Sequence, residues 1–299
     1  MKNMLFIYNP YSGKAQLKNN LSEILDIFTK AGYIITVRPT QQSGDAYDFI
    51  RARQGEFELI CVSGGDGTLN EAVRGVLAFD EASRPPIGYI PTGTTNDFAS
   101  NLGIPKDMIE AAKIVTDGEL RKVDIGSFNG RTFNYVAAFG AFTDISYETP
   151  QNVKNIFGQA AYLMEVVKKF APIERVNVEL KCGDEVRKGE YAVCLVLNSS
   201  HVAGVEFGER YCVDLNDGLF EVALIERPVS LLMLSNTIAS IMQGKTQGHG
   251  FEVLKASEIS ISTDRPVRWT LDGEFGGETD TAEISVIKGA CKFIGKGDL

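Results

Sequence analysis

The chain has 299 residues, of which 44% are hydrophobic and 23% charged, and its net charge is −9. This composition is typical of a globular protein and excludes a disordered chain or one that needs disulfides or metal ions to fold. The acidic balance argues against nucleic acid as the main partner and gives no overall attraction to an anionic membrane.

The first 125 residues alternate short apolar runs with segments of helical periodicity. Strands are predicted at 5–8, 34–37, 59–62 and 87–90, and helices at 17–31, 46–53, 69–77, 96–101 and 107–116. Because the runs are apolar throughout, the alternation predicts a parallel sheet covered by helices on both faces. We therefore expect a doubly wound α/β domain over residues 1–125.

After residue 125 the pattern changes to strands separated by turns such as Asn129-Gly130 and Asn216-Asp217-Gly218. Strands are predicted at 123–128, 132–138, 176–180, 191–197, 219–225, 258–262 and 267–271, with helices only at 158–170 and 229–242. This pattern predicts an antiparallel β domain over 126–289. The tail, 290–299, is predicted to return to the first domain as a last strand.

Several features bear on location. The apolar run at residues 4–8 is too short for a signal segment, and the apolar stretch 229–242 is shorter than the ~20 residues that span a bilayer. No CxxC motif occurs among the scattered cysteines, which favours reduced thiols in a cytoplasmic protein. These cysteines are Cys61, Cys182, Cys194, Cys212 and Cys291.

Three loops of small and polar residues follow the apolar strands of the first half. They are Asn9-Pro10-Tyr11-Ser12-Gly13-Lys14, Gly64-Gly65-Asp66-Gly67-Thr68 and Pro91-Thr92-Gly93-Thr94-Thr95-Asn96-Asp97. The ends of parallel strands gather along one edge of a sheet, where ligands bind. Glycines let main-chain amides approach a phosphate closely, and the helix that follows adds free N–H groups.

Asp66 lies between glycines, where direct contact with a phosphate would be repulsive. We interpret this carboxylate as acting through Mg²⁺ or a water bound to it. A tight turn with an exposed aspartate is the alternative, and the hydroxyls and amide of the third loop favour a ligand site. Lys14 by itself is more typical of a solvated lysine, and the spacing excludes a Walker loop.

The motif at 64–68 resembles the nucleotide-binding motif shared by diacylglycerol kinases, sphingosine kinases, NAD kinases and phosphofructokinases. The other two loops, read as Asn9-Pro10-x-Ser12-Gly13-Lys14 and Pro91-x-Gly93-Thr94-x-Asn96-Asp97-Phe98-Ala99, narrow the resemblance to the diacylglycerol kinase catalytic family. Val123-Asp124-Ile125-Gly126 and Leu271-Asp272-Gly273-Glu274 match that family in order and spacing. The resemblance covers essentially the whole chain and is strongest to the soluble kinases of Gram-positive bacteria.

The resemblance implies an amino-terminal nucleotide-binding domain, a carboxy-terminal β-sandwich domain and an active site in the cleft between them. It implies that ATP binds at Asn9, Pro10, Ser12, Gly13, Lys14, Thr40, Gly64, Gly65, Gly67, Thr68, Asn70, Glu71, Gly93, Thr94, Asn96 and Asp97. It also implies a structural Mg²⁺ held by Asp214, Asp217 and the carbonyl of Leu219. Residues 214–218 are rich in oxygen ligands, which suits a hard cation, although a plain hairpin turn explains them as well.

Phosphoryl transfer to a hydroxyl needs in-line positioning, neutralisation of the γ-phosphate and an acceptor for the hydroxyl proton. The resemblance places Asp272 and Glu274 opposite the glycine loops. We favour Glu274 as the general base, with Asp272 orienting it or the metal, although the sequence does not separate the two roles. Asp66, with Asp97 and Asp124, is expected to organise Mg²⁺ near the phosphates.

Diacylglycerol is the expected acceptor, with phosphatidic acid as the product. Kinases of another lipid alcohol (undecaprenol, a sphingoid base or phosphatidylglycerol), an NAD kinase and an inactive nucleotide-binding module are the alternatives. Peripheral contact with the inner face of the membrane follows from a lipid substrate. The helix predicted at 158–170 is one candidate for that contact, and core packing is the other. The resemblance also implies a homodimer, for which the sequence gives no interface.

Overall fold

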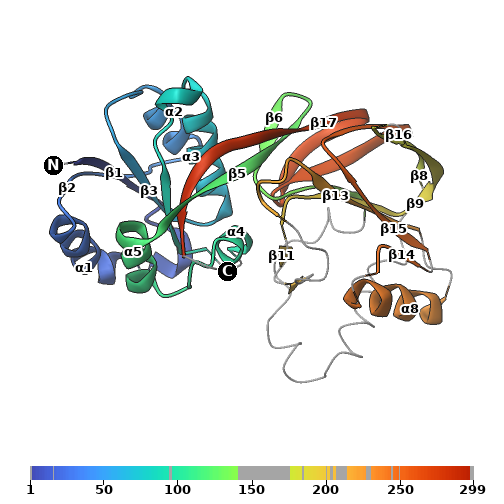
Figure 1. Cartoon of the computed structure of the whole chain (residues 1–299), viewed down its shortest axis with the longest axis horizontal. Helices are drawn as coiled ribbons and strands as arrows, with labels where there is room; N and C mark the ends of the chain where they lie inside the picture. The colour runs from blue at the N-terminus through green and yellow to red at the C-terminus, as the bar shows by residue number, and fades with distance from the viewer. Residues whose placement is uncertain are drawn as a thin grey trace.

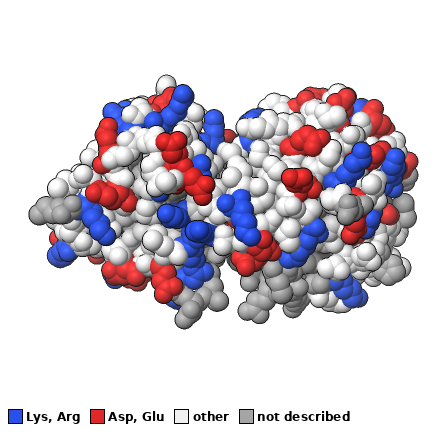
Figure 2. Space-filling view, turned by 45° about the horizontal axis from the view of Figure 1, so that its top comes forward, with Lys and Arg blue, Asp and Glu red and all other residues white. Residues whose placement is uncertain are grey.

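The computed structural model consists of two lobes joined by long strands (Figure 1). A space-filling view shows the waist between the lobes, with several Lys and Arg side chains beside it (Figure 2). The structure describes residues 2–15, 17–93, 96–140, 176–183, 185–199, 201–202, 205–206, 214–226, 230–243, 245–248 and 250–296.

The amino-terminal lobe is built on four parallel strands in the order β4-β3-β1-β2. They are β1 (Lys2–Tyr8), β2 (Tyr33–Pro39), β3 (Leu59–Gly64) and β4 (Ile87–Pro91). The helices are α1 (Leu17–Lys30), α2 (Asp45–Arg51), α3 (Asp66–Leu77), α4 (Asp97–Asn101) and α5 (Met108–Asp117), with short 3₁₀ turns η1 (Ser12–Ala15) and η2 (Glu81–Ser83). Helices α1 and α5 pack together at one face of the sheet, and α2 and α3 at the other (Figure 1). The predicted doubly wound domain is confirmed.

Burial explains why these short strands are so apolar. Residues 59–64 of β3 and 87–91 of β4 are all buried, because both faces of each strand are covered. In β1, Phe6 is fully buried and packs edge-on against Phe28 of α1 at 5.7 Å. Strand β2 is the edge of the sheet, and its Ile34 and Val37 are exposed.

The second lobe is antiparallel, as predicted. Its longer strands are β5 (Glu119–Phe128), β6 (Arg131–Phe133), β7 (Val136–Gly140), β8 (Val176–Cys182), β9 (Glu185–Tyr191), β10 (Val193–Leu197), β13 (Phe220–Ile225), β15 (Phe251–Ala256), β16 (Glu258–Leu271) and β17 (Glu274–Gly295). Two-residue strands β11 (His201–Val202), β12 (Val205–Glu206) and β14 (Gln247–Gly248) and helix α8 (Leu231–Met242) complete the described elements. Trp269 lies at the centre of this lobe's core, with ring centroids 4.8 Å from Phe128 and 5.0 Å from Phe139.

Three strand predictions differ from the structure for local reasons. The strand predicted at 132–138 is broken, because the N–H groups of Asn134 and Tyr135 donate to Asp272 instead of a neighbouring strand. The two strands predicted at 258–262 and 267–271 are one strand with a register shift between Ser262 and Val267. Strand β9 was not predicted, because most of its exposed positions are charged. The helix predicted at 158–170 lies outside the described residues.

Strand β17 connects the two lobes. It pairs with β16 and β5 through most of its length, and Phe293 near its end pairs in parallel with Ile87 of β4 (Figure 1). The tail of the chain therefore completes the sheet of the first lobe. A single hydrogen-bonded path of strands runs from β14 to β2, so the relative position of the two lobes is set by main-chain pairing.

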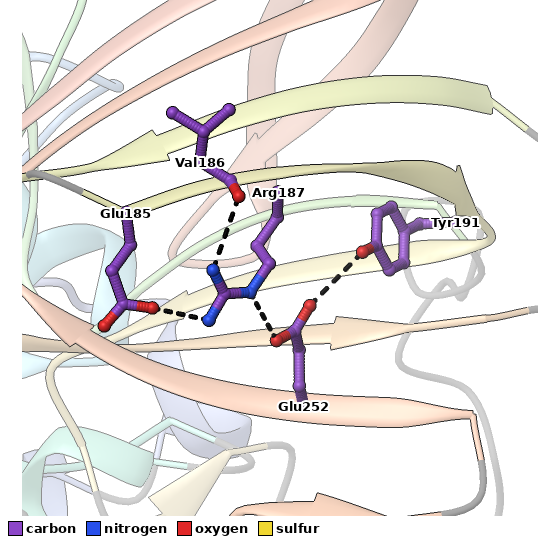
Figure 3. Close-up of polar contacts among 5 residues, drawn as sticks. All are labelled: Glu185, Val186, Arg187, Tyr191 and Glu252. Atoms are coloured by element: carbon purple, nitrogen blue, oxygen red, sulfur yellow. Dashed lines mark hydrogen bonds and ion pairs between the residues drawn. The ribbon is translucent and has the colours of Figure 1, made fainter.

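Side chains also connect β9 to β15, two strands that share no main-chain pairing. Glu252 of β15 accepts from Arg187 Nε at 2.9 Å and from the Tyr191 hydroxyl at 3.2 Å (Figure 3). Burial and the charge of Glu252 raise the pKa of Tyr191 to about 12, so the hydroxyl stays a donor. This network contributes to the fold of the second lobe.

Four of the five cysteines are described, and Cys61, Cys182, Cys194 and Cys291 are all buried free thiols, as predicted. Cys212 lies outside the described residues. Over the part of the chain that the structure describes, no helix has the length and hydrophobicity needed to cross a bilayer.

Candidate active site

The three glycine-containing loops meet at the carboxyl ends of β1, β3 and β4. The Asn9 N–H donates to the Ser63 carbonyl at 2.9 Å, and the Thr92 N–H donates to the Gly64 carbonyl at 2.9 Å. A Cβ added to Gly13 would lie 2.0 Å from the Thr92 carbonyl oxygen, so only glycine fits there. The first and third loops are thus in direct main-chain contact.

The second loop touches the third in the same way. A Cβ added to Gly93 would lie 2.6 Å from the Gly65 Cα. Helix α3 begins at Asp66, three residues before the predicted start, so the end of the glycine motif forms the first helical turn. Gly65 provides no side-chain cap, and the N–H groups of the first turn therefore stay available for an anion.

Asp66 is half-buried in this first turn, and its Oδ1 atom is buried without a hydrogen-bond partner in the described part of the chain. Burial, followed by the charges of Asp97 and Asp272, raises its pKa to about 7, although N–H groups of Phe98 and Asn96 act in the opposite direction. An orphaned carboxylate oxygen among other acids is suited to a cation or to water bound to one.

Asp272 is buried in the turn between β16 and β17, with a positive φ of 52°. Its Oδ2 accepts from the Asn134 N–H at 2.7 Å and the Asn70 side-chain amide at 2.9 Å. Its Oδ1 accepts from the N–H groups of Tyr135 at 2.9 Å and Val136 at 3.2 Å. Burial raises the pKa of Asp272 to about 6 against the effect of these donors. Both oxygens are therefore occupied, and the bond to Asn70 joins the β-lobe turn to α3.

Glu274, two residues later, has the opposite environment. Its side chain is exposed, and the structure gives it no hydrogen bond or ion pair with any described residue. Its Oε1 nevertheless lies at the start of α3, because a Cβ added to Gly67 would come within 2.6 Å of it. A free carboxylate is thus held beside the glycine loops, on the side of the β lobe.

Several of the predicted nucleotide-binding residues hold the loops in place. Asn96, itself in a left-handed conformation, accepts from the Gly93 N–H at 2.9 Å and donates to the Gly93 carbonyl at 2.8 Å. Glu71 accepts from the N–H groups of Gly44 at 2.8 Å and Ala46 at 3.2 Å, which fixes the start of α2. The side-chain hydrogen bonds of Asn96 and Glu71 therefore support the loops of the site.

The remaining predicted residues are close to the same edge. Thr40 is buried, and its N–H donates to the carbonyl of Tyr8 at the end of β1. The Thr68 side chain lies against Gly64, and Asp97 is buried at the start of α4, near Asp66. Pro10 and Ser12 are half-buried in the first loop. Thr94 and the side chain of Lys14 lie outside the described residues.

The predicted metal loop lies beside β5, where the Asp124 N–H donates to the Leu215 carbonyl at 2.7 Å. Asp214 Oδ1 accepts from the Asn216 N–H at 2.9 Å, and Asp217 Oδ1 accepts from the Leu219 N–H at 2.8 Å, as in ordinary aspartate turns. Lys255 Nζ lies 4.0 Å from Asp217 Oδ2. Within the described ranges, no group of three or more His, Cys, Asp or Glu side chains is placed to hold a metal ion. Two carboxylates and a carbonyl match the ligand chemistry of Mg²⁺, but water would have to complete the shell.

Asp124 makes structural contacts that the sequence did not predict. It is buried and accepts from the Gly218 N–H at 2.7 Å and from the Gly289 N–H at 2.6 Å. This carboxylate therefore fastens the 214–219 loop to β17. The expectation that Asp124 also helps to organise Mg²⁺ near the phosphates stays a prediction.

Some residues that shape the site left no signal in the sequence. The main-chain N–H groups of Asn134, Tyr135 and Val136 orient Asp272, and main-chain donors are independent of residue type. Asn70 was predicted as a nucleotide contact, whereas in the structure its side chain bonds to Asp272. Only the tertiary structure brings these groups together.

Comparison with known proteins assigns the family. Residues 3–128 match the model of the diacylglycerol kinase catalytic domain, and residues 142–294 match that of the YegS C-terminal NAD kinase beta sandwich-like domain. A diacylglycerol kinase of Bacillus subtilis is 34% identical over 93% of this chain and 91% of its own length. The chain belongs to the diacylglycerol kinase family. Family membership makes the chain an ATP-dependent lipid kinase.

Other members of the diacylglycerol kinase family agree. A diacylglycerol kinase of Staphylococcus epidermidis is 36% identical over 93% of this chain and 87% of its own length. A crystal structure of a diacylglycerol kinase from Bacillus anthracis covers 99% of this chain and 97% of its own, with a TM-score of 0.78 at 24% identity. That likeness establishes the two-domain fold, in which an α/β lobe precedes a β-sandwich lobe.

Proposed function

We propose that this lipid kinase transfers the γ-phosphate of Mg-ATP to the hydroxyl group of diacylglycerol and so forms phosphatidic acid. The observation that carries the proposal is the position of Glu274, whose free carboxylate lies beside Gly67 at the start of α3. An unpartnered base next to a glycine-lined edge with free N–H groups has the two elements that phosphoryl transfer to an alcohol requires. The relatives from Bacillus subtilis and Staphylococcus epidermidis are diacylglycerol kinases, which favours diacylglycerol as the acceptor.

ATP would place its phosphates against the main chain of the three loops, near Gly13, Gly65 and Gly93. The N–H groups of the first turn of α3 would neutralise part of their charge. The orphaned Oδ1 of Asp66 fits a role in holding Mg²⁺ or its water shell. The metal, when bound, supplies charge neutralisation at the β- and γ-phosphates.

Glu274 would act as the general base. The acceptor hydroxyl gives its proton to this carboxylate while its oxygen bonds to the γ-phosphorus, and the bond from that phosphorus to the β-γ bridging oxygen breaks to release ADP. Asp272 is a positioning residue in this scheme, because its two oxygens accept four hydrogen bonds and have no capacity left for the substrate. It holds the turn that carries Glu274 against Asn70 of α3.

Asp214, Asp217 and the Leu219 carbonyl would hold a second, structural Mg²⁺ in the 214–219 loop, which Asp124 fastens to β17. Diacylglycerol resides in membranes, so we also propose peripheral contact of the protein with the inner face of the membrane. A homodimer is proposed from the family resemblance alone.

The test is transfer of labelled γ-phosphate from ATP, with and without Mg²⁺, to a detergent-mixed panel of diacylglycerol, undecaprenol, sphingosine, phosphatidylglycerol and NAD. Labelling of diacylglycerol alone, and only with Mg²⁺, is the expected result. Labelling of another lipid would retain the mechanism and replace the substrate. Labelling of none, with ATP still bound, would overturn the proposal in favour of a nucleotide-binding module.

A further inference from the structure

A separate pocket with charged side chains in its lining lies at the other end of α3 from the glycine loops. Its volume is about 380 Å³, which is within the range of small-ligand sites. Helix α3 has 12 residues and is therefore ~18 Å long, so about this length of helix separates the pocket from the glycine loops. The pocket is lined by Glu81, Ala82, Arg84, Lys122, Gly289, Ala290 and Lys292. Three cationic side chains and one carboxylate thus surround it, in a chain whose net charge is −9.

Arg84 is fixed at the wall of this pocket. Its guanidinium donates to the carbonyls of Ala290 at 3.0 Å, Phe79 at 3.2 Å and Leu77 at 3.4 Å. These bonds join the end of α3 to β17 and use three of the five N–H groups that an arginine carries. The group is therefore oriented before any ligand binds, and it keeps two donors and its full charge.

Lys122 of β5 and Lys292 of β17 are direct cross-strand partners in the antiparallel register. Both side chains are exposed, and neither ammonium group has a hydrogen bond or ion pair with the residues that the structure describes. Like charges directly opposite each other destabilise a strand pair. A Cβ added to Gly289 would lie 3.5 Å from Lys122 Cδ, so the absence of a side chain at Gly289 leaves room beside Lys122. An anion bound between the two ammonium groups would remove this repulsion.

We propose that this pocket binds a phosphate group carried by a ligand other than the nucleotide of the glycine loops. A fixed guanidinium and two free ammonium groups are the donors that recognise phosphate oxygens. The ligand is either a membrane phospholipid with a phosphate monoester headgroup or a soluble phosphate compound. The site is independent of catalysis, so it regulates or localises the enzyme and does not turn over substrate.

Binding to vesicles tests the proposal. The double variant Lys122→Gln/Lys292→Gln is compared with Lys18→Gln/Lys106→Gln, which removes the same charge from two exposed lysines elsewhere on the first lobe. The apparent dissociation constant for phosphatidylcholine vesicles containing phosphatidic acid should rise about 30-fold in the first variant, at roughly 1 kcal/mol per lysine. It should change less than about threefold in the control. Equal losses in both variants would overturn the site, as would no loss in either together with no response of Lys122 and Lys292 to soluble phosphate.

Two further arms separate the sources of phosphate. Titration with inorganic phosphate and pyrophosphate, followed by NMR of ¹⁵N-lysine-labelled protein, detects a soluble ligand at Lys122 and Lys292. Binding to vesicles alone assigns a lipid headgroup.

The variant Lys292→Glu separates phosphate binding from stability. Its carboxylate would pair with Lys122 and relieve the repulsion, so this variant should melt no lower than the wild type and still lose phosphate binding. The variant Asp66→Asn, which is altered at the glycine loops, should bind the vesicles like the wild type. Failure of the kinase proposal can therefore be distinguished from failure of the phosphate-pocket proposal.

Discussion

The two walls of the candidate active site differ in the groups that they present. On the α/β side, Gly13 and Gly93 bring the main chains of three loops into contact at distances that exclude a Cβ. On the β side, the turn after β16 presents Asp272 and Glu274. In the proposed mechanism the first wall would hold phosphates through its main-chain packing, whereas Glu274 of the second would accept a proton. Substitutions in the two walls should therefore fail in different ways.

The β wall itself contains a second contrast. Asp272 is buried and accepts four hydrogen bonds, whereas Glu274 is exposed with its oxygens free. The two residues are separated by one glycine, and the direction of each side chain underlies the positioning role proposed for Asp272 and the chemical role proposed for Glu274. Both contrasts can be tested by substitution, beginning with the largest expected loss of activity.

Glu274→Gln should lower kcat by about 10²–10⁴-fold, the usual loss when a positioned base is removed. ATP affinity and the melting temperature should stay close to those of the wild type, because the side chain is exposed and makes no bonds with described residues. Steady-state assays with labelled ATP, together with thermal melts, provide the measurement. A variant with near-normal turnover would remove Glu274 from the mechanism.

Gly13→Ala should destabilise the first lobe and weaken ATP binding. Its positive φ of 55° strains any L-residue by ~1–2 kcal/mol, and contact of the new methyl with the Thr92 carbonyl adds about 1–3 kcal/mol. Gly55→Ala is the matched control, because Gly55 also has a positive φ but no atom within 4 Å of an added Cβ. Urea unfolding of both variants isolates the packing contribution. Equal losses would show that the loop contact does not matter.

Asp272→Asn should lower both the stability and the activity. The new amide group would point N–H donors at main-chain N–H donors, which leaves buried groups unpaired at a cost of about 1–3 kcal/mol. Displacement of the turn would then lower kcat. The measurement is urea unfolding combined with the kinase assay, and loss of activity at unchanged stability would instead give Asp272 a direct chemical role.

The last prediction concerns the pH dependence of stability, which is measured without catalysis. Because the pKa of Asp66 is raised to about 7, the folded state binds a proton that the unfolded state, with a pKa of ~3.9, has released. In the absence of Mg²⁺, the free energy of unfolding should thus decrease as pH rises from about 4 to about 7. Asp66→Asn should reduce this slope, leaving the part that Asp272 contributes up to its pKa of about 6. Identical slopes in urea unfolding would contradict the assignment.

The two lobes differed in how much of their structure could be predicted. In the α/β lobe, strands buried on both faces are apolar throughout, so each run was visible as a strand. In the β lobe, β9 and most of β17 carry charged residues on exposed positions and were not predicted. The break at Asn134 was also invisible, because it depends on a hydrogen bond to a residue far along the chain.

For the active site, the sequence by itself determined the chemical groups: three glycine-containing loops after buried strands, Asp66 among glycines, and the Asp272-Gly273-Glu274 turn. The tertiary structure alone decided the direction of each carboxylate. It turned Asp272 toward main-chain donors, left Glu274 free beside Gly67, and turned Asp124 toward the 214–219 loop. The physical reason is that residue type and spacing fix which groups are present, whereas burial and hydrogen bonding depend on contacts between strands distant in the chain.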